Sequence, residues 1–331
     1  MNVKDLDAFI CGLIGGNYVE RKEVIQELWG GYGILMRCFI NGGISNSVIV
    51  KHINLSFVGQ HPRGWATTNS HTRKLKSYKV ESSFYKSYSA VLSENCKVPK
   101  CYGVRFGQDE IIIVLEDLCD IGFTEVKSIV DINDIKACLS WLSKFHATFL
   151  QAEPINLWEV GTYWHLQTRP DELRALQDIE LKDAAHKIDG LLSSCNYKTI
   201  LHGDAKLANF CFNNSNEKVA AVDFQYAGGG CGMKDVVYFI GSCLSEVDCE
   251  RYEIILLNHY FKELETALNS LANKNSIDFV QLEEEWRSMY YIAWADFHRF
   301  LKGWSPGHWK VNDYSEKIVR RVLNKLKDHV E

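Results

Sequence analysis

Several features are missing from this 331-residue chain, and each absence excludes a class of protein. No apolar run approaches the roughly 18 residues that a membrane-spanning helix needs. The formal charge is −5, so there is no excess of basic side chains to bind a nucleic-acid backbone. The first residues lead into no signal-type apolar segment. We therefore expect a protein that acts without a membrane and without nucleic acid.

The cysteines also lack a pattern. There are 11 of them, scattered and odd in number, and no two form a Cys-x-x-Cys pair. Several lie in apolar runs, as Cys38 does within 35–40 and Cys211 does within 210–212. Reduced cysteines in such positions behave as small hydrophobic residues, which predicts a cytoplasmic protein without a zinc site. A content of 46% hydrophobic and 24% charged residues is typical of a globular chain.

The first third of the chain reads as a sheet with one helix. Glycine-rich turns at 30–33 and 41–43 separate the first three expected strands. Residues 59–76 form a polar, basic connector, and a helix is expected from about Ser77 to Glu94. The expected strands cover 24–29, 34–40, 47–53, 101–106 and 111–115.

Beyond this point the pattern becomes helical. In 131–151, apolar residues recur on one stripe at the spacing of an amphipathic helix. Further helices are expected at 170–193, 234–249, 251–273, 278–301 and 313–330, and only 199–224 interrupts them with strands. The sequence thus predicts an α+β fold of two lobes, a sheet-containing lobe over 1–117 and a mainly helical lobe over 118–331.

The most informative stretch is 200–209, an apolar lead-in followed by His-Gly-Asp and then an asparagine. It provides Asp204, Lys206 and Asn209, and a short hairpin then provides Asp223. Asp204 is suited to accept the proton of an attacking hydroxyl, and Lys206 to reach a transferred phosphate. Asn209 and Asp223 offer the oxygen ligands that Mg²⁺ prefers, and a metal is needed where carboxylates meet a triphosphate. Any one of these residues alone is better explained by an ordinary turn or hairpin end; the four together, at these spacings, predict a phosphotransferase.

A cation for the ATP phosphates is offered by Lys51. Strand alternation places it on the same face as Ile49 and Ile53, where an unpaired charge is costly. Glu81, which shares a helix face with Tyr85, is its expected partner. The alternatives are a solubilising charge on an edge strand for Lys51 and a solvated helix position for Glu81.

Two weaker signals concern the nucleotide. Gly30, Gly31 and Gly33 lie between the first two strands, where backbone amides can cover phosphates, although a plain tight turn explains them about as well. The backbone from Glu116 to Leu118 follows a strand and can face the adenine, or it is an ordinary strand exit.

The glycine run at 228–232 matches neither a Walker P-loop nor a dinucleotide fingerprint. We expect it to be a flexible segment that follows Asp223. Asp235 is then expected to cap the next helix.

Together these residues resemble the kinase-like phosphotransferases that act on small molecules, a superfamily that includes choline and aminoglycoside kinases. Within this superfamily, the sequence is most similar to the ecdysteroid-kinase-like branch. The resemblance extends over about residues 25–310. The resemblance implies a protein-kinase-like bilobal fold, use of ATP and Mg²⁺, phosphorylation of a small-molecule alcohol, and a bracing role for Asp235 at the catalytic loop. The stretches that carry it are His61–Trp65, Ser70–Glu81, Phe84-Tyr85, Leu115–Leu118, His202–Asp204, Asp223–Gln225, Asp235–Phe239 and Ala293–Phe300.

The acceptor and the oligomeric state stay open. Aromatic residues in the last helices can cage a quaternary ammonium or stack on a ring, or they are simply core. The basic connector can touch an anion or be solvated. A pseudokinase or nucleotide-binding scaffold is an alternative function, and a protein kinase is another, disfavoured because no Ala-Pro-Glu segment follows Asp223. The aromatic and charged residues concerned are Trp286, Tyr290, Tyr291, Trp294, Trp304, Trp309, Asp296, His298 and Arg299; the connector residues are His61, Arg63, His71, Arg73, Lys74 and Lys76.

Overall fold

The computed structural model describes residues 3–56, 68–215, 217–271 and 276–328. Its internal contacts divide the chain into two units. The first unit contains Met1–Glu125, Cys211–Ser215 and Ala220–Gln225. The second unit contains Val126–Phe210, Asn216–Val219 and Tyr226–Glu331. The hairpin that ends at Asp223 therefore contributes residues to the first unit, although most of its sequence neighbours belong to the second.

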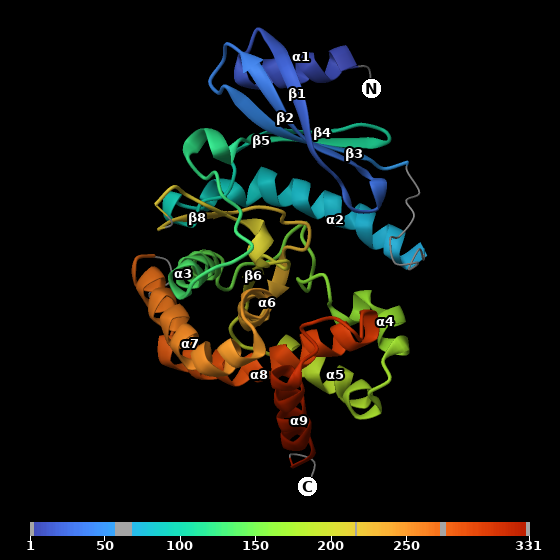
Figure 1. The fold of residues 1–331 in the computed structure, drawn as a ribbon, viewed down its shortest axis with the longest axis vertical. Helices are drawn as coiled ribbons and strands as arrows, with labels where there is room; N and C mark the ends of the chain where they lie inside the picture. Colours follow the sequence, from blue (N-terminus) through green and yellow to red (C-terminus); the bar gives the residue numbers. More distant parts are fainter. Residues whose placement is uncertain (1–2, 57–67, 216, 272–275, 329–331) are drawn as a thin grey trace. The chain divides into compact units, whose positions relative to one another are not determined.

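The first unit is built on a five-stranded antiparallel sheet with the order β1-β2-β3-β5-β4 (Figure 1). The strand bounds follow the turn glycines, because Gly30 and Gly42 adopt positive φ angles that glycine alone tolerates freely. The strands are β1 (Tyr18–Glu27), β2 (Gly33–Asn41), β3 (Ser47–Asn54), β4 (Cys101–Phe106) and β5 (Glu110–Glu116).

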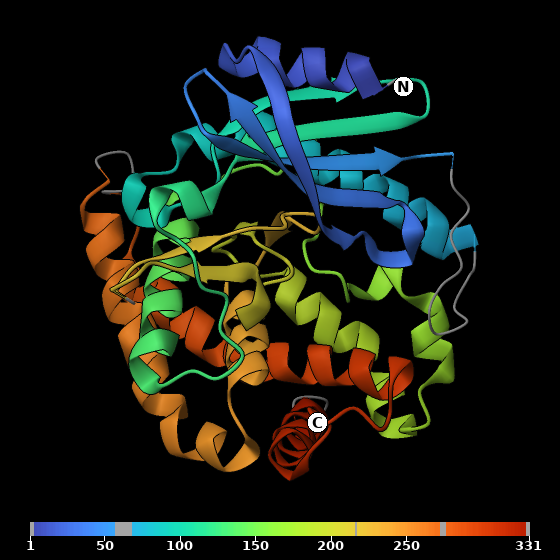
Figure 2. The ribbon, with the colours of Figure 1, turned by 45° about the horizontal axis from the view of Figure 1, so that its top comes forward.

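A helix covers each face of this sheet (Figures 1 and 2). Helix α1 (Val3–Ile14) presents Leu6, Ile10 and Ile14 at helical spacing, and these pack on Met36, Cys38, Ile40, Val48, Val50, Ile112 and Val114 of the sheet. Helix α2 (Thr68–Ser87) covers the opposite face. The alternation of β3 sends Val48 and Val50 toward α1, so Lys51 points to the α2 side.

Several expected bounds in the first unit need correction. Helix α2 ends at Ser87 and begins at Thr68, so the helix expected at 77–94 starts earlier and stops sooner. The described part of the expected connector, from Thr68 to Lys76, is therefore helical, while 57–67 lies outside the described residues. Strand β1 begins at Tyr18 rather than Val24, and α1 was not expected at all. The helical conformation of 68–76 was not predicted because its mostly polar and basic side chains form no apolar stripe.

The second unit is mainly helical, and short polar caps begin several of its helices. Asp131 and Asp134 form a capping box at α3, and Asp178, Ser245 and Asp278 cap α5, α7 and α8. The helices are α3 (Ile132–Thr148), α4 (Pro170–Ala175), α5 (Ile179–Ser193), α6 (Met233–Cys243), α7 (Glu246–Asn269), α8 (Phe279–Trp304) and α9 (Asp313–Asp328). The helix expected over 170–193 is therefore two helices, since Leu176 is extended. None of the helices in the described ranges is both long enough and apolar enough to cross a bilayer.

The glycine run expected to be flexible is instead a strand. Strand β9 (Gly228–Gly230) pairs antiparallel with β6 (Thr199–Leu201). A Cβ atom on Gly228 would lie 2.3 Å from the carbonyl oxygen of Trp158, so only glycine fits this approach. A second two-stranded sheet joins β7 (Phe210–Phe212) to β8 (Val219–Ala221). The antiparallel sheet followed by helices confirms the predicted α+β fold class.

Candidate active site

In the second unit, the buried carboxylate of Asp204 lies directly after β6 and is held by three donors. Its Oδ1 accepts a hydrogen bond from the hydroxyl of Tyr238 at 3.1 Å. Its Oδ2 lies 2.9 Å from Nζ of Lys206 and 3.3 Å from Nδ2 of Asn209. Asp204 is only 7% exposed, so these bonds fix its orientation in a site largely withdrawn from water.

The side chain of Asn209 is oriented by its hydrogen bonds to Asp204. Its amide nitrogen also donates to the backbone carbonyl of Asp204, at 2.8 Å. With the nitrogen turned toward Asp204, the carbonyl oxygen Oδ1 of Asn209 faces the other way. This is the atom that a hard cation would bind.

The backbone of the His-Gly-Asp turn requires glycine at its centre. Gly203 has a φ of 78°, and a Cβ atom there would lie 2.0 Å from the carbonyl oxygen of Tyr226. The neighbouring Thr162 also has a positive φ, of 90°, which is rare for a β-branched residue. Backbone strain of this kind is found at functional sites, where surrounding contacts hold it in place.

Asp235 fastens this turn from α6. Its fully buried carboxylate accepts hydrogen bonds from the backbone amides of His202, at 2.6 Å, and Gly203, at 2.9 Å. His146 Nε2 lies 3.1 Å away on the same carboxylate. The expected capping role is wrong, because Gly232 occupies the N-cap of α6 and no side chain caps it. The bracing contact that the resemblance implied is present.

Tyr238, which bonds to Asp204, and Tyr163, which bonds to Tyr238, are site residues that were not predicted from the sequence. Burial raises the pKa of Tyr238 well above its usual value, and the charge of Asp204 raises it further. Burial likewise raises the pKa of Tyr163, which shares a hydroxyl–hydroxyl contact with Tyr238. Both phenols therefore stay protonated and able to donate. The available signal was the position of Tyr238 one helical turn after Asp235, on the same face of α6.

In the first unit, Lys51 and Glu81 form the buried ion pair that strand and helix periodicity predicted. Nζ of Lys51 lies 2.8 Å from Oε1 and 2.7 Å from Oε2 of Glu81. Burial lowers the pKa of Lys51, but the charges of Asp223 and Glu81 outweigh burial and leave that pKa above its usual value. Burial raises the pKa of Glu81 to about 7, against the pull of Lys51.

Asp223 belongs to the same charged group. Its Oδ1 lies 3.3 Å from Nζ of Lys51 and 2.5 Å from Nε2 of Gln225, and its φ is 70°. The next residue, Phe224, stacks on Phe84 of α2 with ring centroids 3.8 Å apart. The ring thus anchors the turn that presents the carboxylate.

The fit of these groups to Mg²⁺ rests on donor chemistry and access. Asp223 keeps 32% of its side chain exposed and offers a carboxylate, the ligand type that Mg²⁺ favours. Across the described residues, no cluster of three or more His, Cys, Asp or Glu side chains is placed to hold a metal. Mg²⁺ usually keeps phosphate oxygens and water as further ligands, so one or two protein oxygens are enough to hold it.

The weaker nucleotide signals have local structural explanations. Gly30, Gly31 and Gly33 all have positive φ angles, and a Cβ atom on Gly33 would lie 2.0 Å from the carbonyl oxygen of His52. The amide of Glu116 donates to the carbonyl of Lys100, and the carbonyl of Leu118 accepts from Phe123. The nucleotide roles of these residues stay predictions.

Three of the six late aromatic residues are core. Trp286, Tyr290 and Trp294 are at most 3% exposed. Asp296 pairs with Lys234 and Arg299, so it does not face a ligand cage. Within the basic segment, Lys74 donates to Gln225 at 2.7 Å and His71 bonds to Tyr32. His61 and Arg63 lie outside the described residues.

Comparison with known proteins identifies the family. The family model "Ecdysteroid kinase-like family" matches residues 57–155 and 163–273, which is more than half of the chain. The protein therefore belongs to the ecdysteroid kinase-like family. No curated protein matches the chain significantly.

Solved structures with a similar fold include three kinases. An amicoumacin kinase in complex with AMP-PNP and Ca²⁺ is 10% identical, with a TM-score of 0.48 over 99% of this chain and 94% of that one. An ethanolamine kinase from Plasmodium vivax is 12% identical, with a TM-score of 0.46 over 91% and 81%. An aminoglycoside-3′-phosphotransferase of type VIII is 13% identical, with a TM-score of 0.40 over 80% and 93%.

Proposed function

We propose that this protein is a small-molecule kinase that transfers the γ-phosphoryl group of ATP to a hydroxyl, with Asp204 as the catalytic base. The main observation in support of this proposal is the environment of the Asp204 carboxylate. It is a buried carboxylate on a strained turn, held by three side-chain donors, and the turn itself is fastened by Asp235. Membership of a kinase-like family supports the same reaction class.

Each residue has a separate task in this proposal. Asp204 orients the acceptor hydroxyl and takes its proton as the bond to phosphorus forms. Lys206, with 39% of its side chain exposed, reaches from Asp204 toward the transferred phosphoryl group. Lys51 binds the α- and β-phosphates, and Glu81 keeps its ammonium in place. Asp223 and Asn209 are the proposed metal ligands, through carboxylate and amide oxygens.

A bound Mg²⁺ would neutralise phosphate charge during the transfer. What this chain provides for it is orientation: Gln225 and Lys51 hold Oδ1 of Asp223, and Asp204 holds the amide nitrogen of Asn209. We place the glycines at 30, 31 and 33 and the backbone of Glu116 and Leu118 near the nucleotide as part of the same proposal.

The deciding experiment is a screen of alcohols for ADP release by the purified protein, run with wild type and Asp204→Asn. The variant should bind Mg-ATP and lose about 10²–10⁴-fold in turnover, because general-base help is typically of that size. Asp183→Asn, at an exposed position on α5, is the matched control and should keep full turnover. Unchanged phosphoryl transfer in Asp204→Asn would refute the assigned role.

A second measurement tests the metal. Mg²⁺ should add to the thermal stabilisation that ATP gives the wild type, and Asp223→Ala should remove that addition. Equal stabilisation of the wild type with and without Mg²⁺ would contradict the assignment. Wild-type protein that binds Mg-ATP but releases no ADP with any acceptor, water included, would favour the scaffold alternative.

A further inference from the structure

Lys310 lies on the connection between α8 and α9, beside the ring whose hydroxyl holds Asp204. Its Nζ is 4.8 Å from the centroid of the Tyr238 ring and 5.6 Å from that of Phe297. The hydroxyl of Tyr238 donates to Asp204, so one tyrosine side chain links the lysine to the proposed catalytic base. All of these residues belong to the second unit.

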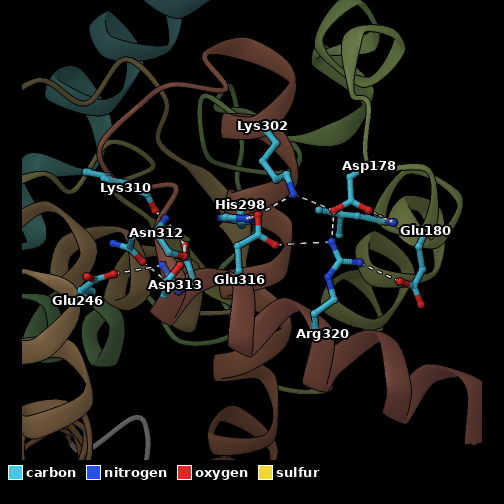
Figure 3. A network of polar contacts seen from close by, with 12 residues as sticks. Asp178, Glu180, Glu246, His298, Lys302, Lys310, Asn312, Asp313, Glu316 and Arg320 are labelled. Atoms are coloured by element: carbon cyan, nitrogen blue, oxygen red, sulfur yellow. Dashed lines mark hydrogen bonds and ion pairs between the residues drawn. The ribbon is translucent and has the colours of Figure 1, made fainter.

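The backbone around Lys310 is fixed by hydrogen bonds (Figure 3). Its carbonyl accepts from Oγ of Ser315. Its amide donates to Nδ1 of His308. Asn312 is bound to Ser315 in both directions, and the amide of Asp313 donates to Glu246 of α7. The lysine is therefore presented from a pre-organised loop, as binding residues require.

The ammonium of Lys310 is a positive charge surrounded by rings. Nζ lies 5.5 Å from the centroid of Trp309, in addition to the two rings above, and within the described part of the chain no carboxylate pairs with it. Burial lowers the pKa of Lys310 to about 8, and the charges of Asp204 and Lys206 act on it in opposite directions. Cation–π contacts stabilise an ammonium by about 0.5–2 kcal/mol and leave its charge in place.

Asp204 does not need this charge, because Lys206 already pairs with it at 2.9 Å. Lys310 is thus a surplus cation next to the proposed base, partly removed from water. A partly buried ammonium without a paired carboxylate is stabilised most by binding an anion, which forms a charge-assisted hydrogen bond with it. The exposed Trp309, 58% accessible, adds an apolar face on which a ring can stack.

We propose that Lys310 recognises the phosphate acceptor, and that the acceptor is a hydroxylated ring compound carrying an anionic group. The inference rests on the proposed kinase function for its biological meaning, but ligand binding tests it separately. The anion pairs with the Lys310 ammonium, the ring lies on Trp309, and the hydroxyl is directed to Asp204.

The test uses two ligands of nearly equal shape, 4-(hydroxymethyl)benzoate and the neutral 4-(hydroxymethyl)benzamide. Calorimetric titration without ATP should show that wild type binds the carboxylate about 10–100-fold more tightly, the range for a charge-assisted hydrogen bond. Lys310→Met should lose this preference, and Lys310→Arg should restore part of it. Lys317→Met, an exposed lysine on α9, is the control and should keep it.

ADP release with the same two alcohols separates the two proposals. The preference should appear there in KM rather than in kcat, since Lys310 acts on binding. A preference in binding that depends on Lys310, without any ADP release, supports this inference and counts against the kinase proposal. ADP release with a preference that Lys310→Met leaves intact overturns this inference and supports the kinase. Wild type that binds neither ligand, or both equally, also overturns it.

Discussion

One hydroxyl group, that of Tyr238, connects the carboxylate of Asp204 to helix α6. Burial and the charge of Asp204 both raise its pKa, so the phenol remains a donor throughout the neutral range. Asp204 thus has a fixed donor on Oδ1 and two donors on Oδ2. Removal of the Oδ1 donor leaves the carboxylate able to rotate away from an acceptor hydroxyl.

Tyr238→Phe should therefore lower kcat by about 10–100-fold, the equivalent of a lost hydrogen bond to a charged group of about 1.5–3 kcal/mol. The ring stays, so packing and the contact with Lys310 are kept. Steady-state ADP release measures the effect. Tyr18→Phe, at an exposed position on β1 in the first unit, should change neither kcat nor stability. A Tyr238→Phe enzyme with wild-type kcat would mean that the hydroxyl does not position the base.

The ion pair of Lys51 and Glu81 allows a test that needs no substrate. Lys51→Met and Glu81→Gln should each destabilise the first unit by about 3–5 kcal/mol, because each leaves a buried charge or dipole without its partner. The double variant should be far more stable than the sum of the two losses predicts. Urea denaturation of the four proteins gives the coupling free energy, expected at about 0.5–3 kcal/mol. Additive losses would contradict the pairing.

At the residue scale, a contact between two side chains could be predicted from the sequence only where strand or helix periodicity fixes their directions. Lys51 and Glu81 were predictable as partners because alternation along a strand and spacing along a helix fix which way each side chain points. Tyr238 and Lys310 were not. The contacts of Tyr238 with Asp204 and of Lys310 with Tyr238 join positions more than 30 residues apart in the sequence, and no local pattern encodes such contacts.

At the scale of elements, the turn after β6 depends on a single glycine. Gly203→Ala places a Cβ atom 2.0 Å from the carbonyl of Tyr226, in addition to the cost of a positive φ. Gly122 has a φ of 89° and nothing within 4 Å of the same position, so Gly122→Ala isolates the conformational cost. We expect about 1–2 kcal/mol for Gly122→Ala and a clearly larger loss for Gly203→Ala, measured by urea denaturation with circular dichroism. Equal losses would show that the close approach to Tyr226 is relieved without cost.

The elements themselves were predicted best where glycine marks their ends. The limits of β2 and β3 fell within one residue of expectation because the turns at 30–33 and 41–43 interrupt the strands. The predicted start of α2 was wrong because every residue of 68–76 except Leu75 is polar. The glycines of β9 were misread as flexible, because their pairing with β6 is a contact between distant segments that composition does not reveal.

At the scale of the whole molecule, the unfolding of the two units can be followed by different spectroscopic signals. Seven of the nine tryptophans, Trp141, Trp158, Trp164, Trp286, Trp294, Trp304 and Trp309, belong to the second unit. Tryptophan fluorescence therefore follows mainly the unfolding of that unit, while circular dichroism follows both. This separation matters because the second unit contains a buried charge cluster of Asp296, Lys234 and Arg299, each at most 2% exposed.

That cluster should make the second unit sensitive to acid. Burial opposes ionisation of Asp296, but Lys234 and Arg299 outweigh it and lower its pKa to about 2, below the usual 3.8. Since the folded form holds this proton less tightly than the unfolded chain, the stabilisation is complete above about pH 4 and disappears as the pH falls through 2. The shift corresponds to about 2 kcal/mol.

Urea denaturation followed by tryptophan fluorescence between pH 2 and 6 should show this decline in the wild type. Glu316 titrates in the same window, because its bonds to His298 and Lys302 lower its pKa to about 2 (Figure 3). A variant must therefore isolate Asp296. Asp296→Asn combined with Lys234→Met removes one charge of each sign, leaves Glu316 intact, and should flatten the decline by about 2 kcal/mol relative to the wild type. An identical pH dependence in the two proteins would mean that the cluster contributes no acid-sensitive stability, and that its charges are retained for another reason.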